Sequence, residues 1–239
     1  MKISTIIIMI FCNVLIYGQT TEGIIKYKQT SYFEFENMPA DMPKSQETYM
    51  RLFFNKSESL YEKDPEVIVV ENSNDNTPRM FRRMRDRSAR IYYKNFAESS
   101  VLEQLGFFGK DFLVSDSIAS IKWKISAGDQ KTILGYTCMK ASYKDSTLNI
   151  VAFFSPQIPV STGPDKYGKL PGLILEFQSA QTHIIATEVS LKALDKPIEK
   201  PSKGDVFTKK EFEKLRAEKM KEQGEMGGRR DGNVRIMRQ

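Results

Sequence analysis

Two side chains in this sequence of 239 residues have types that could take part in nucleophilic or acid–base chemistry: His183, the only histidine, and Cys138, one of two cysteines. A serine or cysteine nucleophile needs a base within hydrogen-bonding reach, and a reactive thiol also needs a lowered pKa. No Gly-x-Ser-x-Gly elbow, Walker loop or dinucleotide-binding glycine pattern accompanies these side chains. We therefore expect a buried structural cysteine, a histidine within a strand and no catalytic residue.

The sequence offers few ligands for a metal ion. A Cys/His zinc site needs three or four such ligands, and beyond residue 18 the chain has one histidine and one cysteine. The oxygen-rich stretch 72–76 lacks the aspartate spacing and the terminal glutamate of an EF-hand loop. We therefore expect no bound metal and no cofactor.

Residues 1–18 have the layout of a secretory signal peptide. Lys2 supplies positive charge, an apolar run extends from Ile6 to Ile16, and Gly18 is a small residue suited to cleavage after it. An uncleaved N-terminal anchor is the alternative. No other stretch contains the roughly 18 apolar residues of a membrane helix, so we do not expect an integral membrane protein. The prediction is an exported protein that is periplasmic, associated with the outer membrane, or secreted.

Two segments carry the positive charge of the chain. Six arginines, among them Arg82, Arg83 and Arg85, lie between residues 79 and 90, and residues 196–239 hold 13 basic and 8 acidic side chains. Such patches favour anionic partners, which for an exported protein are anionic lipid, acidic polysaccharide or an acidic face of an envelope protein. We expect no nucleic acid partner. The alternative is a solvated loop followed by a solvated helix.

Short stretches of alternating apolar and polar residues recur between turn-forming segments along residues 19–202. At the start of this part, Ile25, Tyr27, Phe33 and Phe35 alternate with polar residues, as in a half-buried strand. No long stretch within it has helical periodicity. The pattern predicts a mainly β domain, an antiparallel sheet that forms either a curved half-barrel or a two-layer sandwich.

One C-terminal α-helix is expected in a charged segment, residues 203–224. Thr208 and Glu211 have the spacing of a capping box, so the helix should begin at about Lys209. The glycines that follow favour an end to the helix. Residues 225–239 are predicted to be a disordered tail.

The densest turn signal lies around residue 170. The hexapeptide Lys169-Leu-Pro-Gly-Leu-Ile174 predicts a type II turn, in which Pro171 supplies a negative φ and Gly172 a positive φ. Such turns could do no more than set the register of the strand that follows. Alternatively, they hold a rigid loop that binds a ligand or partner, for which the candidate residues are Tyr167, Lys169, Leu170, Pro171 and Gly172.

This segment resembles the signature of the GLPGLI family, exported bacterial proteins that are named after the hexapeptide. The resemblance implies export and a β-rich fold, and it implies no catalytic residue, since the family has no assigned activity. Lys169 stands where the family name has its first glycine. It either adopts a positive φ, at a cost of about 1 kcal/mol, or narrows and charges a ligand site. Further blocks that resemble the family are residues 121–125, 131–141, 154–159 and 200–208.

The sequence therefore favours an exported, non-enzymatic binding or interaction module of the cell envelope with an unknown ligand. One alternative is an accessory protein of an outer-membrane transporter, with the charged C-terminal helix as its docking element. Another is a hydrolase that lacks a recognisable motif, for which His183 and Cys138 would be the side chains to test.

Overall fold

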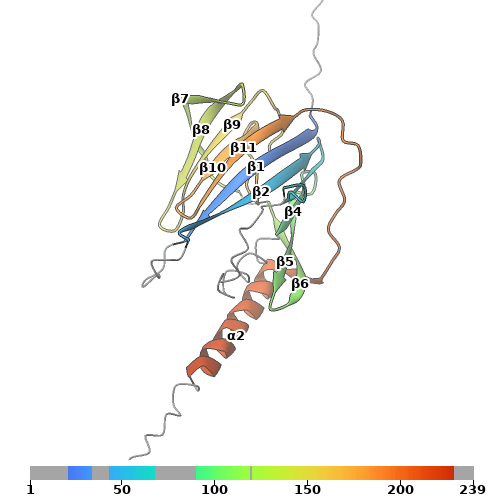
Figure 1. Cartoon of the computed structure of the whole chain (residues 1–239), viewed down its shortest axis with the longest axis vertical. Coiled ribbons are helices and arrows are strands. Elements are labelled where there is room, and N and C mark those ends of the chain that lie inside the picture. Colours follow the sequence, from blue (N-terminus) through green and yellow to red (C-terminus); the bar gives the residue numbers. More distant parts are fainter. Residues whose placement is uncertain (1–20, 34–42, 68–89, 119, 229–239) are drawn as a thin grey trace, which may run out of the picture.

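The computed structural model describes residues 21–33, 43–67, 90–118 and 120–228, and within them twelve strands form one open sheet that is followed by a single helix (Figure 1). The strand order across the sheet is β12-β6-β5-β4-β3-β2-β1-β11-β10-β9-β8-β7. All neighbouring pairs are antiparallel except β12 with β6, which are parallel. The elements are β1 (Gly23–Tyr32), β2 (Ser45–Phe54), β3 (Glu58–Lys63), β4 (Ile91–Asn95), β5 (Ser100–Phe107), β6 (Lys110–Ser117), β7 (Lys124–Ile133), β8 (Tyr136–Lys144), β9 (Asn149–Ser155), β10 (Leu173–Gln178), β11 (Thr182–Ser190), β12 (Asp205–Thr208) and α2 (Lys209–Gly228).

The predicted mainly β fold with one C-terminal helix is confirmed. Because all twelve described strands are hydrogen-bonded into one sheet, the architecture is a single curved sheet and not the two-layer sandwich that the sequence left open. Among the described residues, no helix combines the length and the apolar character needed to cross a membrane. The predicted signal peptide, residues 1–18, lies outside the described residues.

The alternation of side chains along β1 and β2 divides the sheet into a core face and an outer face. Ile25 and Tyr27 of β1 are fully buried, and their cross-strand partners Leu52 and Met50 are buried beside them. Side chains two residues apart share a face, so Lys26 and the other intervening residues point the opposite way. Charged side chains such as Lys26 therefore lie on the outer face, and the apolar side chains of the core lie on the other face.

A loop covers the core face where a sandwich would place a second sheet. We call residues 156–172, which connect β9 to β10, the motif loop. Its side chains Ile158, Val160 and Leu170 are buried in the same cluster as Tyr27 and Leu52. The hydrophobic core thus lies between the curved sheet and the motif loop.

The helix α2 begins at Lys209, as the capping box predicts. Thr208 Oγ1 accepts a hydrogen bond from the Glu211 amide, and Glu211 Oε2 accepts one from the Thr208 amide. Phe212 in the first turn packs against Phe107 and Phe112 in a second, smaller core. Beyond this contact the helix extends away from the sheet (Figure 1).

Two boundaries of this region differ from the expected helical segment 203–224. Residues 205–208 form β12, because they pair in parallel with the otherwise free edge of β6. The helix also extends beyond the expected boundary at residue 224, so that residues 225–228 are helical where a disordered tail was expected, and it ends at Gly228, within the glycine-containing segment that was expected to end it. Glycine in a helix costs only about 1 kcal/mol relative to alanine, which is too little to fix the end of a helix that is already capped. Residues 229–239 lie outside the described residues.

Candidate functional site

A fully buried lysine fastens the motif loop to the sheet. Lys94 of β4 is 1% exposed, and its Nζ donates hydrogen bonds to the carbonyl oxygens of Gly163 (2.8 Å) and Tyr167 (2.6 Å) and to Thr162 Oγ1 (3.3 Å). Burial lowers the pKa of this amine to about 7, and the nearby carboxylate of Asp165 opposes that shift. Lys94 therefore links β4 to the motif loop, two segments that are far apart in sequence.

Other polar contacts reinforce the same attachment. Thr162 Oγ1 is also within 3.0 Å of Ser59 Oγ from β3, and Trp123 Nε1 donates to the Gly168 carbonyl oxygen at 3.1 Å. Just after the loop, Tyr27 donates its hydroxyl proton to the carbonyl oxygen of Ile174 in β10 at 2.7 Å. The motif loop is thus held by side chains of β1, β3 and β4 and by the segment before β7.

The five loop residues predicted as a site lie close together in the motif loop, but some of their side chains are buried and others are exposed. Leu170 and Gly172 are buried, and Tyr167 is half-buried with its ring stacked on Phe177 at a centroid distance of 4.0 Å. Lys169 and Pro171 are exposed. Only these last two are available to a partner without movement of the loop.

The backbone explains why glycine suits both position 169 and position 172 of the hexapeptide. Lys169 has a φ of 60° and Gly172 a φ of 153°, so the lysine occupies a conformation that glycine adopts without strain. The positive φ expected at Gly172 is confirmed, but the expected type II turn is not formed. The Gly172 amide bonds to the Leu170 carbonyl oxygen, and the Leu173 amide bonds to Ile158 instead. The hydrogen bond between Leu170 and Gly172 closes a turn of three residues, which is a γ-turn with Pro171 at its centre.

The two side chains considered for catalysis each have other partners and are not paired with one another. His183 Nε2 is 3.1 Å from Glu176 Oε1, and the other oxygen of this largely buried carboxylate pairs with Lys131. Cys138 is fully buried, and burial raises the pKa of its thiol to about 11. Since the thiolate is the reactive form, Cys138 is unreactive at neutral pH. Among the described residues, no three or more His, Cys, Asp or Glu side chains are grouped to hold a metal ion.

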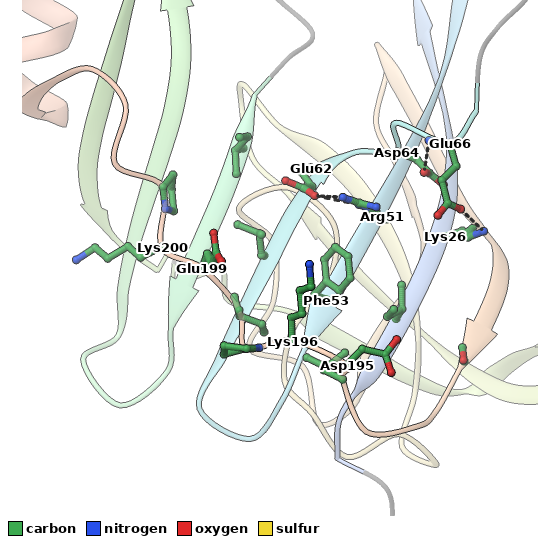
Figure 2. Close-up of a pocket in the computed structure, with 18 of the residues that line it drawn as sticks. Lys26, Arg51, Phe53, Glu62, Asp64, Glu66, Asp195, Lys196, Glu199 and Lys200 are labelled. Carbon is green, nitrogen blue, oxygen red and sulfur yellow. Dashed lines mark hydrogen bonds and ion pairs between the residues drawn. The ribbon is translucent and has the colours of Figure 1, made fainter.

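A groove of about 920 Å³ lies on the outer face of the sheet, under the connector of residues 191–204 that links β11 to β12 (Figure 2). Outward-facing side chains of β1 to β5 line one wall, and the connector lines the other. We call this the outer groove. Its apolar lining is formed by Ile24, Phe53, Leu60, Ile91, Leu194, Pro197, Ile198 and Pro201, and its charged lining by Lys26, Arg51, Glu62, Asp64, Glu66, Glu188, Lys192, Asp195, Lys196, Glu199, Lys200 and Lys203.

The charges of the outer groove are partly paired. Arg51 donates to Glu62 Oε1 at 2.6 Å and stacks its guanidinium 4.8 Å from the centre of the Phe53 ring, so the middle of the groove carries a closed ion pair over an apolar floor. Lys26 Nζ is 3.5 Å from carboxylate oxygens of both Glu66 and Glu188. The pKa of Lys26 is raised, chiefly by Glu188.

Asp64 differs from the other carboxylates of the groove because it is buried. The residue is 1% exposed, and its Oδ1 accepts a hydrogen bond from the Glu66 amide at 3.0 Å. Its other oxygen, Oδ2, is inaccessible and has no hydrogen-bond partner. Buried polar atoms are nearly always paired, so this oxygen is an exception, enclosed in the wall of the groove and not open to it.

The outer groove was not predicted from the sequence, although a weak signal was present. Ile24, Phe53 and Leu60 are apolar residues at positions where the alternation predicts a solvent-facing side. Only the pairing of β1, β2 and β3 brings them onto one wall, and only the connector makes that wall a groove. The predicted arginines Arg82, Arg83 and Arg85 lie outside the described residues.

A family model described as a protein of unknown function (Porph_ging) matches residues 144–176, the stretch from the end of β8 through the motif loop into β10. The hexapeptide thus falls in a segment shared by a family of unknown function, while the GLPGLI name itself remains a resemblance. No curated protein matches the chain.

The fold is similar to that of a larger protein of known structure. Two crystal structures of PNGF-II match the chain, one in space group P21 with a TM-score of 0.55 and 16% identity, the other in space group C2 with a TM-score of 0.50 and 18% identity. The matches cover 82% and 73% of this chain but only 33% and 28% of PNGF-II, so the chain spans about a third of that protein's length or less. At these identities the likeness concerns the fold alone.

Proposed function

We propose that this chain is an exported, non-enzymatic binding module of the cell envelope, and that it holds its ligand in the outer groove. The observation that carries the proposal is the groove itself, about 920 Å³ in volume, with an apolar floor and a charged rim. Ligand sites typically measure roughly 300–1,000 Å³ and combine apolar walls with a few polar groups. The groove lies on the face opposite the core, so a ligand can enter without disturbing the packed interior.

The motif loop supports this function in a different way. Its carbonyl oxygens bond to Lys94, and its apolar side chains belong to the core. We assign it the role of holding the sheet curved, with Lys169 and Pro171 as the part that a protein partner could contact. Binding in the groove then depends on the loop indirectly, through the curvature of β1 to β4.

Site-specific photocrosslinking in envelope preparations tests the proposal. A benzoylphenylalanine at Phe53, in the groove, should crosslink one defined species, which mass spectrometry of the adduct would identify. The same probe at Leu148, which is 42% exposed and distant from the groove lining, is the matched control. Equal adducts at the two positions, or none at Phe53, would contradict a ligand site in the groove.

A specific observation also favours the accessory role at an outer-membrane transporter. Most of α2 extends away from the sheet (Figure 1), and only its first turns, with Phe212 and Leu215, pack on the body. A chain truncated after Leu215 keeps this packing and loses the extended part. If α2 is a docking element, the truncated chain should fail to pull down the transporter component that the full chain retains. The hydrolase alternative has no such observation in its favour.

A further inference from the structure

We infer that the connector is a movable strap, fixed at both ends, whose middle lifts from the sheet to admit a ligand to the outer groove and then packs back over it. The inference rests on the proposed binding function and specifies how that site opens and closes. It is carried by two firm anchors, by the lack of polar contacts with described residues between them, and by the length of the connector compared with the distance that it spans (Figure 1).

The first anchor holds the connector at the end of β11. Ser190 still pairs with Ile24 of β1, and Leu191 packs against the main hydrophobic core. Gly23 of β1 lies so close that a Cβ there would be 2.3 Å from the Ser190 carbonyl oxygen and 3.2 Å from Leu191 Cα. The two backbones are therefore in direct contact, and movement at this end would separate packed core residues.

The second anchor holds the connector to β5 and β6, just before β12 begins. The Lys203 amide donates a hydrogen bond to Gln104 Oε1 at 3.3 Å, and Lys203 Nζ lies 2.7 Å from Asp111 Oδ2. Gly204 has a φ of 123°, and a Cβ there would be 2.6 Å from the carbonyl atoms of Asp111. This end of the connector is therefore held by polar contacts and by close backbone packing.

The middle of the connector lacks such contacts. Residues 192–202 form no hydrogen bond and no ion pair with any residue in the described part of the chain. Only Leu194, Ile198 and Pro201 are half-buried among them. The charged side chains are all exposed, and they are Lys192, Asp195, Lys196, Glu199 and Lys200. Segments with few buried contacts and no internal hydrogen bonds open at a low cost in free energy, so the middle should lift while the anchors hold.

The connector is longer than the distance between its anchors. Six strands, β1 to β6, lie between β11 and β12 in the sheet. Neighbouring strands are about 4.8 Å apart, so the span is roughly 34 Å. Residues 191–204 can extend to about 46–50 Å, at 3.3–3.6 Å for each residue. The excess lets the middle rise by an amount on the order of 10 Å, while both ends stay attached.

Apolar side chains on both walls favour closure over a ligand that has an apolar part. Ile24 and Phe53 on the sheet, and Leu194 and Ile198 on the connector, line the groove and remain half-exposed. A ligand that inserts its apolar part between the two walls removes surface of both from water when the connector packs back. The closed position is therefore stabilised most when such a ligand is bound.

Double electron–electron resonance on the full chain tests the movement without any ligand. One pair of nitroxide labels is placed at Glu47→Cys on β2 and Glu199→Cys on the connector, and the matched control pair joins Glu47→Cys to Lys110→Cys on β6. All three positions are exposed. Every variant also carries Cys12→Ser, while Cys138 is fully buried and stays unlabelled. The distance distribution of the connector pair should be wider than that of the control pair by about 10 Å. Equal widths would overturn the inference.

A second measurement with the same labels asks whether the apolar contacts close the connector. The double variant Leu194→Ser and Ile198→Ser should reduce the population of short distances about fivefold or more, because two apolar side chains no longer pack on the sheet. Lys196→Ser, an exposed position of the connector, is the matched control and should leave the distribution unchanged. The same distribution in both variants would overturn the inference. Since the photocrosslink at Phe53 reports a ligand and not movement of the connector, a Phe53 adduct with a narrow distance distribution would refute the strap and leave the groove function standing.

Discussion

Lys94 Nζ lies 2.6 Å from the carbonyl oxygen of Tyr167, and this hydrogen bond joins β4 to a loop 73 residues later in the chain. The amine has three neutral oxygens as partners and is 1% exposed. A buried charge without a carboxylate partner is costly. Three acceptors match the three N–H donors of an ammonium, whereas burial disfavours its charge, so the strength of the contact depends on the protonation state of Lys94.

This relationship predicts a pH dependence of stability. The pKa of Lys94 is about 7 in the folded chain, against about 10.4 for an unfolded lysine. Between these values the folded state binds fewer protons than the unfolded state, so the contribution of Lys94 to the free energy of unfolding rises with pH. Below about pH 7 both states are protonated and the contribution is at its lowest.

Urea denaturation of the wild-type chain and Lys94→Met at pH 6.5 and pH 9.5 measures this effect. Lys94→Met leaves the carbonyl oxygens of Gly163 and Tyr167 without their donor, which costs about 1–3 kcal/mol for each buried acceptor. The wild-type chain should exceed the variant in stability by more at pH 9.5 than at pH 6.5. A gap that is constant or that widens toward low pH would show that the buried amine stays charged.

Replacement of Lys169 by glycine is predicted to stabilise the fold. Its φ of 60° is a left-handed conformation that costs a residue with a Cβ roughly 1–2 kcal/mol. Lys169→Gly should therefore raise the free energy of unfolding by about 1 kcal/mol. The matched control is Lys166→Gly in the same loop, since Lys166 is exposed and has no positive φ. It should lower stability by about 0.5–1 kcal/mol through added freedom of the unfolded chain. Lowered stability in both variants would contradict the prediction.

Substitution of Gly172 is predicted to destabilise the fold severely. A Cβ at this position would overlap the carbonyl group of Ser155 and the nitrogen of Pro156, and the φ of 153° is strained for any other residue. Gly172→Ala should lower the free energy of unfolding by about 3 kcal/mol or more, because the neighbouring atoms are backbone and cannot rotate away. Gly128→Ala, where no atom lies within 4 Å of the added Cβ, should stay within about 0.5 kcal/mol of the wild type. Thermal unfolding followed by circular dichroism measures both variants.

The arginine segment predicts binding to anionic surfaces. Six arginines between residues 79 and 90 give that stretch a net charge of +5, since Asp86 is its one acidic residue. Sedimentation with vesicles of mixed phosphatidylserine and phosphatidylcholine should retain the wild-type chain at low salt and release it as salt is raised. The triple variant Arg82→Ala, Arg83→Ala and Arg85→Ala should bind at least fivefold more weakly, while Lys169→Ala should bind as the wild type does. Equal binding by the triple variant would remove the segment from any role at a membrane.

The local elements of this fold could be predicted because local chemistry fixes them. The alternation at Ile25 and Tyr27 predicts a strand with one buried face, and β1 has that face. The capping box at Thr208 and Glu211 predicts the first residue of α2 correctly. The positive φ of Gly172 likewise follows from a residue type that has no Cβ.

The functional geometry could not be predicted in the same way. From the sequence, Lys94 looks like any other polar residue of a strand. Nothing near it in sequence indicates that its amine is buried under the motif loop. Asp64 directly follows β3, and nothing near it in sequence indicates that its side chain is buried with one oxygen unpaired. Each of these features depends on pairing between segments that are far apart in the chain.

The amino-acid sequence alone determined where strands, turns and the helix start form, because side-chain alternation, glycine φ and capping act over a few residues. The tertiary structure decided that the strands join one curved sheet, that the motif loop closes its core face, and that the outer groove opens on the other face. Those outcomes are set by the register between distant strands, since a shift of one residue would exchange the buried and the exposed side chains along the whole strand.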